Sequence, residues 1–115
     1  SKLYLDRIVD DDDQELLVAE RGGAVVGLIH LQLYDTPRSS VFVDRRRAHV
    51  EDLVVDDSHR RRAVGTALLE AGEQWARRHQ ATQLVLTVWT GNDAGEAFYE
   101  RHGYQAVSRV LAREL

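Results

Sequence analysis

The stretch VEDLVVDDSHRRRAVGTALL, residues Val50–Leu69, decides how the rest of this chain is interpreted. It opens with a β-branched, apolar run, Val50–Val55, which is typical of a strand. A polar turn at Asp56–Ser58 follows, and three arginines then lead into a segment with apolar residues at helical spacing. The residues of this stripe are Val64, Ala67, Leu68, Ala71 and Trp75. The stretch therefore predicts a strand, a loop and a helix in direct succession.

The start of the predicted helix, near Ala63, has the properties of an anion site. A helix N-terminus carries unpaired N–H groups and a partial positive charge. Ala63 and Gly65 are small, so an anion can approach the backbone. The guanidinium groups of Arg60–Arg62 can pair with phosphate oxygens, although the same arginines could instead form a solvated corner. We expect an anion here, and a diphosphate in particular.

The composition predicts one globular domain, residues 1–115, large enough to bury a core. A net charge of −4 does not suggest a broad nucleic-acid surface. There is no cysteine, hence no disulfide, no thiolate metal site and no cysteine nucleophile. No apolar run has membrane-spanning length and no signal peptide is visible, so we expect a cytoplasmic protein with neither a membrane nor a nucleic-acid partner.

The remaining segments read as a mixture of strands and helices. The turn Arg21–Gly23 joins two predicted strands as a hairpin. Lys2–Val9 could be a strand or the end of a helix, and Pro37–Arg47 reads as a hairpin tip bordering a substrate site. The predicted strands are Glu15–Glu20, Ala24–Tyr34, Ala48–Val55, Gln83–Trp89 and most of Tyr104–Leu115. The first predicted helix, which begins near Ala63, ends near His79, and the second spans Ala94–His102. Alternation places Val25, Gly27, Ile29, Leu31 and Leu33 on one face of their strand.

Two segments resemble the signatures of the GNAT superfamily of acetyl-CoA-dependent N-acetyltransferases. Arg60–Gly65 is similar to the acyl-CoA loop, Gln/Arg-x-x-Gly-x-Gly/Ala, with Ala63 in place of the first glycine. Asn92–Tyr104 is similar to Asn-x-x-Ala-x-x-Phe-Tyr-Glu-x-x-Gly-Phe, with Gly95 in the alanine position. The two motifs occur in the family's order, about a helix and a strand apart. The resemblance covers roughly Val50–Tyr104.

The resemblance implies an α/β (α+β) fold: a mixed, mostly antiparallel sheet with flanking helices, in which a parallel central strand pair splays apart. It also implies shortened N-terminal elements. The usual first strand and two helices would be absent or reduced to Ser1–Val9. Since those helices normally roof the acceptor site, we expect that a homodimer partner could supply the missing wall.

The resemblance further implies acetyl-CoA as cosubstrate. Its pantetheine arm would hydrogen-bond the strand backbone at Leu53–Val55, and its diphosphate would lie on the N–H groups of Arg61–Thr66. A backbone N–H near Val54 would polarise the acetyl carbonyl. The expected cofactor-binding residues are Leu53, Val54, Val55, Arg60, Arg61, Arg62, Ala63, Val64, Gly65, Thr66, Asn92 and Tyr99. No metal is expected, because the five histidines are scattered.

The implied reaction is transfer of an acetyl group to a primary amine by direct attack in a ternary complex, the chemistry of an N-acetyltransferase (EC 2.3.1.-). Tyr99 matches the family's general acid, although it could be only a half-buried aromatic. Glu51 resembles the acidic position of the diamine acetyltransferase branch and is the expected base; it could instead be paired with an arginine, and His49 is the other candidate base. Asn92 could order the cofactor arm, cap the following helix, or do both.

Two alternatives remain at this stage. One is a catalytically weak acyl-CoA-binding or regulatory module; the other, a nucleotide-phosphate binder, is disfavoured because the chain has no Gly-Lys-Ser/Thr P-loop. The acceptor is also open between a small-molecule and a protein amine. Glu51 and Asp52 suit a cationic acceptor, whereas Arg45–Arg47 would suit an acidic one.

Overall fold

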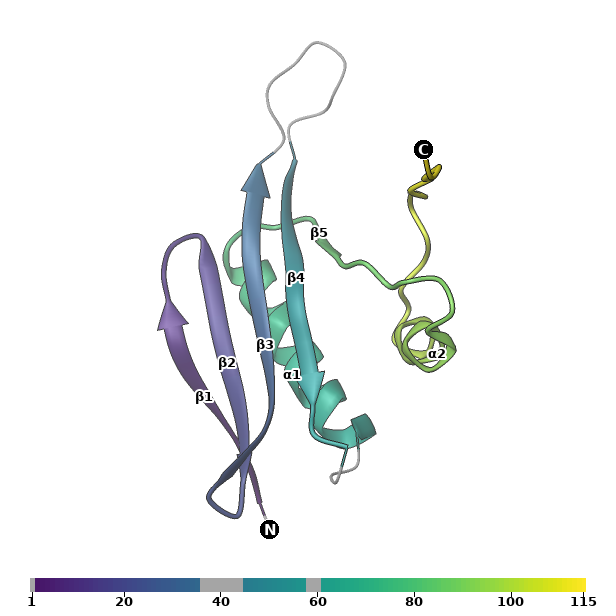
Figure 1. The fold of residues 1–115 in the computed structure, drawn as a ribbon. Helices are drawn as coiled ribbons and strands as arrows, with labels where there is room; N and C mark the ends of the chain where they lie inside the picture. The colour runs from purple at the N-terminus through teal and green to yellow at the C-terminus, as the bar shows by residue number, and fades with distance from the viewer. Residues whose placement is uncertain (1, 36–44, 58–60) are drawn as a thin grey trace.

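The fold is organised around a five-stranded sheet whose strands follow one another in chain order (Figure 1). The computed structural model describes residues 2–35, 45–57 and 61–115. The strands are β1 (Leu3–Asp10), β2 (Gln14–Arg21), β3 (Ala24–Asp35), β4 (Arg46–Val55) and β5 (Gln83–Val85); the helices are α1 (Arg61–Arg78) and α2 (Asp93–Arg101). β1 to β4 pair antiparallel, and β5 pairs parallel to β4. This confirms the predicted mixed, mostly antiparallel sheet.

Local sequence explains how the antiparallel strands are joined. Gly22 and Gly23 have φ angles of 61° and 80°, the left-handed pair that a two-residue hairpin turn requires. The predicted turn at Arg21–Gly23 is therefore confirmed. Lys2–Val9, for which the sequence left strand or helix open, lies in strand β1 apart from its first residue. The acidic connection to β2 is a tight one, in which the Asp11 N–H donates to the Gln14 carbonyl oxygen at 3.1 Å.

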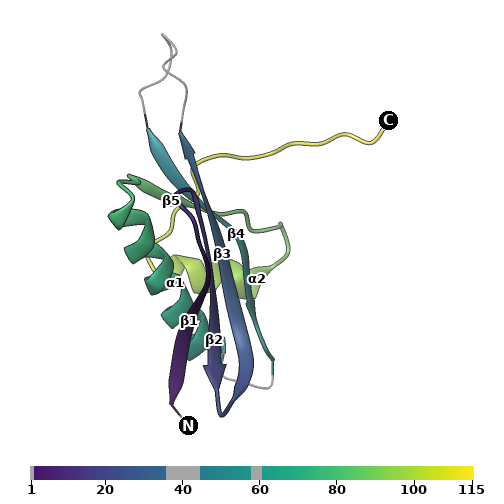
Figure 2. The same ribbon diagram turned by 90° about the vertical axis from the view of Figure 1, so that its left-hand side faces the viewer.

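Helix α1 lies along one face of the sheet and closes the core (Figure 2). Its side chains Val64, Leu68 and Trp75 are at most 1% exposed. They pack with the buried sheet residues Leu17, Ala19, Val26, Ile29, Leu31 and Ala48. Burial of one large apolar side chain contributes about 1.5–3 kcal/mol, so this stripe holds the helix on the sheet. None of the described helices is long and apolar enough to cross a membrane.

A β-bulge in β3 changes which of its side chains face the core. The pairing of β2 with β3 passes over Val26, which is 1% exposed, whereas its neighbour Val25 is 58% exposed. The prediction that Val25 shares a face with Gly27 and Ile29 is therefore wrong. An extra residue in one strand inverts the alternation, and a strict period of two cannot reveal it.

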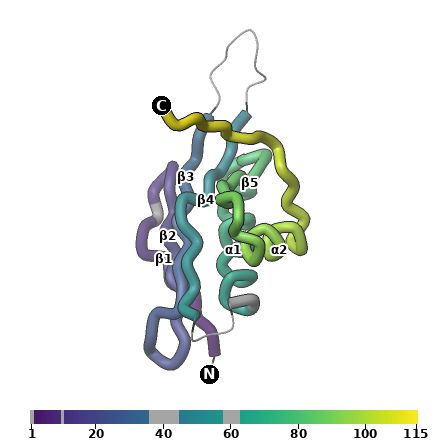
Figure 3. Tube along the Cα trace, turned by 45° about the vertical axis from the view of Figure 1, so that its right-hand side comes forward, coloured from purple at the N-terminus to yellow at the C-terminus, as the bar shows by residue number. Residues whose placement is uncertain are grey.

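Two other predictions fail towards the C-terminus. Gln83–Trp89 is paired only at Gln83–Val85, because the chain then diverges from β4. Tyr104–Leu115 forms no strand, although every residue in it is described, and it runs to the C-terminus without joining the sheet (Figures 2 and 3). Its β-branched residues favour a strand, but propensity without a partner edge makes no ladder. Most of the predicted hairpin tip, Pro37–Arg47, lies outside the described residues, because the description resumes only at residue 45. The fourth strand begins at Arg46, two residues earlier than predicted.

Gly27 tests the close contact between β3 and its neighbours. An alanine there would place its Cβ 2.9 Å from the Val54 carbonyl oxygen and 3.0 Å from Cγ1 of Val64. Since neither atom can move freely, we expect Gly27→Ala to lower the free energy of unfolding by about 1–3 kcal/mol, measured by urea denaturation. The control is Val25→Thr on the exposed side of the bulge, which we expect to change stability by less than about 0.5 kcal/mol. Equal stability of Gly27→Ala and wild type would contradict the described packing.

Candidate functional site

The two parallel strands separate halfway along β4. β4 pairs with β5 only at Arg47, Ala48 and His49, whereas on its other edge β4 remains paired with β3 as far as Val55. The predicted cofactor-binding backbone of Leu53, Val54 and Val55 lies beyond the point of separation. The predicted splay is therefore present, and it leaves an open strand edge where an extended ligand could add hydrogen bonds.

Helix α1 begins within a few residues of the end of β4, so its N-terminus lies beside this open edge. Its first turn contains no acidic side chain, and unpaired N–H groups at a helix start attract anions. Ala63 is exposed, and Val64 and Gly65 are buried against the body of the protein. Ala63 belongs to the helix, so alanine in the first glycine position of the signature requires no left-handed backbone. Arg60 lies outside the described residues, and Arg61 is the first residue of the helix.

Helix α2 is fixed at its start by Asn92. The Asn92 Oδ1 accepts a hydrogen bond from the Gly95 N–H at 3.1 Å, which confirms the capping role. A Cβ on Gly95 would lie 2.5 Å from Nδ2 of Asn92. Glycine at position 95, where the signature has alanine, therefore leaves space for the Asn92 side chain to cap the helix. A role of Asn92 in ordering the cofactor arm stays a prediction.

Two tyrosines, Tyr99 on α2 and Tyr104 just after it, lie close together and differ in what their hydroxyls do. Their ring centroids are 5.7 Å apart, and Tyr99 also meets Phe98 at 5.1 Å. The Tyr104 hydroxyl donates to Glu73 of α1 at 2.6 Å. Within the described part of the chain, no hydrogen bond engages the Tyr99 hydroxyl. Burial raises the pKa of Tyr99 above its ordinary value near 10, so its phenol is protonated and can donate a proton.

The open face of the sheet carries the second group of polar side chains. The pairing of β3 with β4 passes over Glu51, which forms a bulge. The Tyr34 hydroxyl donates to Oε1 of Glu51 at 2.9 Å, and the Tyr34 ring meets the His49 ring edge-on at 4.5 Å. The hydrogen bond to the Glu51 carboxylate raises the pKa of Tyr34. Tyr34 thus contacts both candidate bases, Glu51 through its hydroxyl and His49 through its ring.

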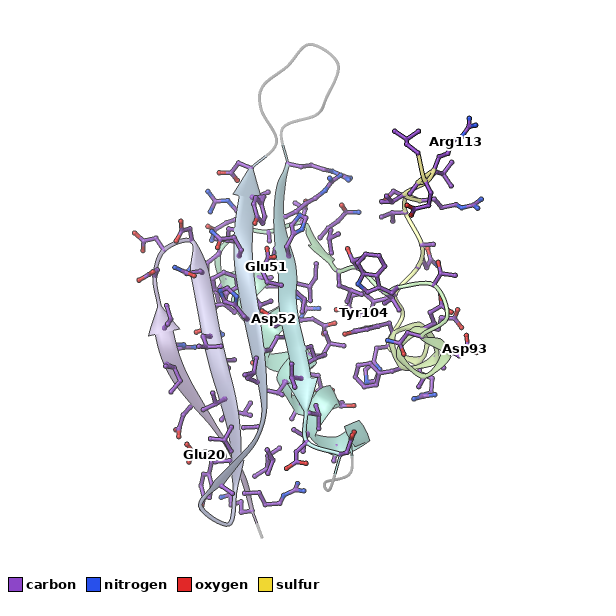
Figure 4. The ribbon with its side chains drawn as sticks, viewed as in Figure 1. Glu20, Glu51, Asp52, Asp93, Tyr104 and Arg113 are labelled. Atoms are coloured by element: carbon purple, nitrogen blue, oxygen red, sulfur yellow. The ribbon has the colours of Figure 1, made fainter. Side chains whose placement is uncertain are left out.

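The bulge also brings the next carboxylate to this face. Asp52 pairs with His30 across the strands, and its Oδ2 lies 3.8 Å from Nδ1 of His30. The His30 Nε2 is 3.2 Å from Oε1 of Gln14. Figure 4 shows Glu51 and Asp52 at mid-length of β4 and Tyr104 between β4 and α2. Regular alternation would send the two carboxylates to opposite faces, and the bulge makes them neighbours.

The arginines at the start of β4 have structural partners of their own. Arg46 donates to Asp35 at 2.8 Å and to the His79 carbonyl oxygen at 3.0 Å. Arg47 donates to Oε1 of Gln83 at 2.9 Å and so ties β4 to β5. Two of the three arginines that could have favoured an acidic acceptor are therefore engaged in the fold.

The structure brings the predicted residues into two groups rather than one. Tyr99 packs beside Tyr104 and Phe98, whereas Glu51 belongs to the open face of β3 and β4. A cavity of about 390 Å³ lies elsewhere, between α1, β5 and the segment after α2, and none of the predicted site residues is among the described residues that line it. No group of described side chains is arranged to hold a metal ion.

Two residues of these groups were missed by the sequence analysis. Tyr34 alternates with His30 on β3, so its face could have been found from the period of two. Its partner could not, because a bulge decides which carboxylate it meets. The sequence assigned no role to His102; the structure places it half-buried, 3.1 Å from the Thr66 hydroxyl.

Comparisons with known proteins agree with this geometry. The Acetyltransferase (GNAT) family matches residues 1–104. Streptothricin acetyltransferase A from Bacillus subtilis (strain 168) is 28% identical over 96 residues, which make up 83% of this chain and 56% of that protein. This chain thus spans little more than half the length of that relative.

Solved structures show the same fold. A mutant of the BH1408 protein from Bacillus halodurans gives a TM-score of 0.85 at 24% identity, over 90% of this chain and 66% of that chain. AAC(6')-Iy in complex with the bisubstrate analog CoA-S-monomethyl-acetylneamine gives a TM-score of 0.78 at 16% identity, over 91% of this chain and 71% of that chain. The family match extends over both signature segments and over both splayed strands, β4 and β5. The chain therefore belongs to the acetyltransferase (GNAT) family, whose cosubstrate is acetyl-CoA.

Proposed function

We propose that this protein transfers the acetyl group of acetyl-CoA to a primary amine by direct attack in a ternary complex. The observation that carries the proposal is the separation of β4 from β5, which leaves the β4 backbone from Val50 to Val55 open beside the N-terminus of α1. An extended pantetheine arm fits a free strand edge, and a diphosphate fits unpaired helix N–H groups. The backbone of Leu53–Val55 would hold the arm. Of the predicted range Arg61–Thr66, only the first turn, Arg61–Ala63, has free N–H groups for the diphosphate, because the later ones donate within α1.

In the proposed step the neutral amine nitrogen attacks the thioester carbonyl carbon, so that a C–N bond forms and the C–S bond breaks. Glu51 takes a proton from the amine through water, and Tyr99 gives its phenolic proton to the departing sulfur. The backbone N–H near Val54 stabilises the developing negative charge on the carbonyl oxygen. The products are the N-acetylated amine and CoA.

We propose a cationic acceptor. Glu51 and Asp52 lie side by side on an open face, together with the Tyr34 and His49 rings. Arg46 and Arg47 are engaged elsewhere in the fold, so they do not offset these carboxylates. Carboxylates attract ammonium groups, and aromatic faces favour them further. Streptothricin, for which one relative is named, is the first acceptor to screen. Neamine, the amine of the analog bound to AAC(6')-Iy, is the second.

A catalytically weak acyl-CoA-binding module is the alternative. The observation that favours it is that Tyr99 and Glu51 lie in two separate groups of side chains. Such a module would bind acetyl-CoA without turning over any amine. The binding and turnover measurements described next separate the two functions.

Ala63 tests the anion site without disturbing the core, because its side chain is exposed. We expect wild type to bind acetyl-CoA at micromolar concentration in a calorimetric titration. Ala63→Asp should weaken binding at least tenfold, about 1.4 kcal/mol, because a carboxylate repels the diphosphate. The helix should persist, since aspartate is favourable in a first turn.

The matched control for this substitution is Ala63→Asn, which has nearly the same shape without the charge. We expect its affinity for acetyl-CoA to stay within about threefold of wild type. Absence of binding by wild type would contradict the proposed function. Unchanged affinity of Ala63→Asp would place the diphosphate elsewhere.

Tyr99→Phe tests the proposed acid. We expect kcat to fall by roughly 10²–10⁴, with the affinity for acetyl-CoA nearly intact. Since burial raises the pKa of Tyr99, the wild-type rate that depends on this residue should not decline between pH 7 and 9. A decline is expected only above about pH 10, where the phenol loses its proton.

Tyr104→Phe is the control for Tyr99→Phe, because its hydroxyl binds Glu73 rather than facing the site. We expect it to cost about 1 kcal/mol of stability and to leave kcat within about twofold. Normal turnover by Tyr99→Phe, measured with the same amine, would remove the acid role.

Glu51→Gln tests the base and decides between Glu51 and His49. Glutamine keeps an oxygen that can accept from the Tyr34 hydroxyl, so the bulge should survive, but it cannot take up a proton. We expect kcat to fall by roughly 10–10³ with little change in acetyl-CoA affinity. The kcat of His49→Gln should fall less than the kcat of Glu51→Gln. A larger fall in His49→Gln would assign the base to His49.

A further inference from the structure

The imidazole ring of His102, in the second signature segment, reaches Thr66, the residue that follows the first segment. It lies at the C-terminal cap of α2. Its Nδ1 is 2.8 Å from the Phe98 carbonyl oxygen, and its Nε2 is 3.1 Å from the Thr66 hydroxyl of α1. The ring also stacks on Phe98, with centroids 4.5 Å apart. One side chain therefore bridges the end of α2 and the beginning of α1.

The contacts determine the tautomer of the ring in its neutral form. A carbonyl oxygen can only accept, so Nδ1 of His102 carries the proton and donates to Phe98. In the neutral ring Nε2 is then an acceptor, and the Thr66 hydroxyl donates to it. The hydroxyl proton of Thr66 is therefore used within the protein. Thr66 lies beyond the first turn of α1, so its backbone N–H donates within the helix and the diphosphate does not depend on it.

Few other contacts fix the position of α2. None of its side chains is fully buried. Phe98 packs against Gly65 of α1, where an added Cβ would lie 3.2 Å from the ring, and Tyr104, just after α2, donates to Glu73 of α1. The backbone N–H of His102 donates to the Tyr99 carbonyl oxygen at 3.0 Å. His102, which reaches α1, is thus hydrogen-bonded to the backbone of Tyr99, the proposed acid.

We propose that His102 is a positioning residue: the hydrogen bond between the Thr66 hydroxyl and Nε2 of His102 holds α2, and with it Tyr99, at a fixed place relative to the diphosphate end of α1. The proposal rests on the proposed function. Positioning has a large effect on rate, since a displacement of about 1 Å can cost up to a hundredfold. Binding of acetyl-CoA through backbone N–H groups does not require the bridge.

The experiment compares Thr66→Val, His102→Ala and the double variant with wild type. For each single variant we expect kcat to fall roughly tenfold, with the KM for acetyl-CoA within about twofold. The double variant should lose no more than either single variant, because both remove the same interaction. Thr66→Ser, which keeps the hydroxyl, should restore kcat to within about twofold of wild type.

His79 provides the matched control. Its Nδ1 is 2.9 Å from the Trp75 carbonyl oxygen four residues earlier, and its ring packs on Trp75 at 4.6 Å. It therefore has the same local arrangement as His102, at the far end of α1. His79→Ala should lower thermal stability without changing kcat. Loss of stability without loss of kcat in Thr66→Val and His102→Ala would overturn the positioning role, and so would additive losses of kcat in the double variant.

A measurement independent of turnover keeps this proposal separate from the proposed function. The ¹⁵N chemical shifts of the His102 ring report which nitrogen carries the proton. We expect the Nδ1–H form in wild type and a shift of Nε2 alone in Thr66→Val. A proton on Nε2, or no change in Thr66→Val, would overturn the bridge even in an active enzyme. A wild type with the expected shifts and no turnover would overturn the acetyl-transfer function, and with it the effect of the bridge on rate.

Discussion

The site depends on the point at which β4 stops pairing with β5. On one edge β4 is held by β3 through its whole C-terminal half, and beyond it the Asp56 N–H still donates to the Val26 carbonyl oxygen at 2.8 Å. On the other edge the pairing ends at His49. Backbone N–H and C=O groups that leave a sheet need other partners. This free edge, next to the start of α1, is what makes the fold suitable for an extended ligand that ends in a diphosphate.

A single inserted residue gives the open face its chemistry. The bulge at Glu51 turns two successive carboxylates to the side away from α1. Without it, one of them would point into the apolar core, where an unpaired charge is costly. Tyr34 then fixes the Glu51 carboxylate by a hydrogen bond. The bulge therefore serves the fold, by keeping charge out of the core, and the proposed site, by concentrating charge opposite a cationic amine.

The two helices differ in how firmly they are attached. α1 buries a complete apolar stripe, including Trp75, against the sheet. α2 buries no side chain completely, so a few polar and aromatic contacts decide where it lies. His102 and Phe98 supply those contacts at the end that meets α1. An element held by few contacts can be displaced at low cost, and the proposed positioning role of His102 rests on this property of α2.

The sequence by itself determined the order of the elements from β2 to α2, the turn at Gly22–Gly23, the cap at Asn92 and both signature segments. These features follow from local rules: glycine tolerates a left-handed backbone, asparagine caps a helix, and periodicity marks a buried stripe. Only the tertiary structure decided where β4 and β5 separate, that Glu51 meets Tyr34, and that His102 reaches Thr66. Those contacts join residues far apart in the chain, and an extra residue in a strand changes their register without leaving a local signal. The strand expected at Tyr104–Leu115 fails for the same reason, because propensity is local and a partner edge is not.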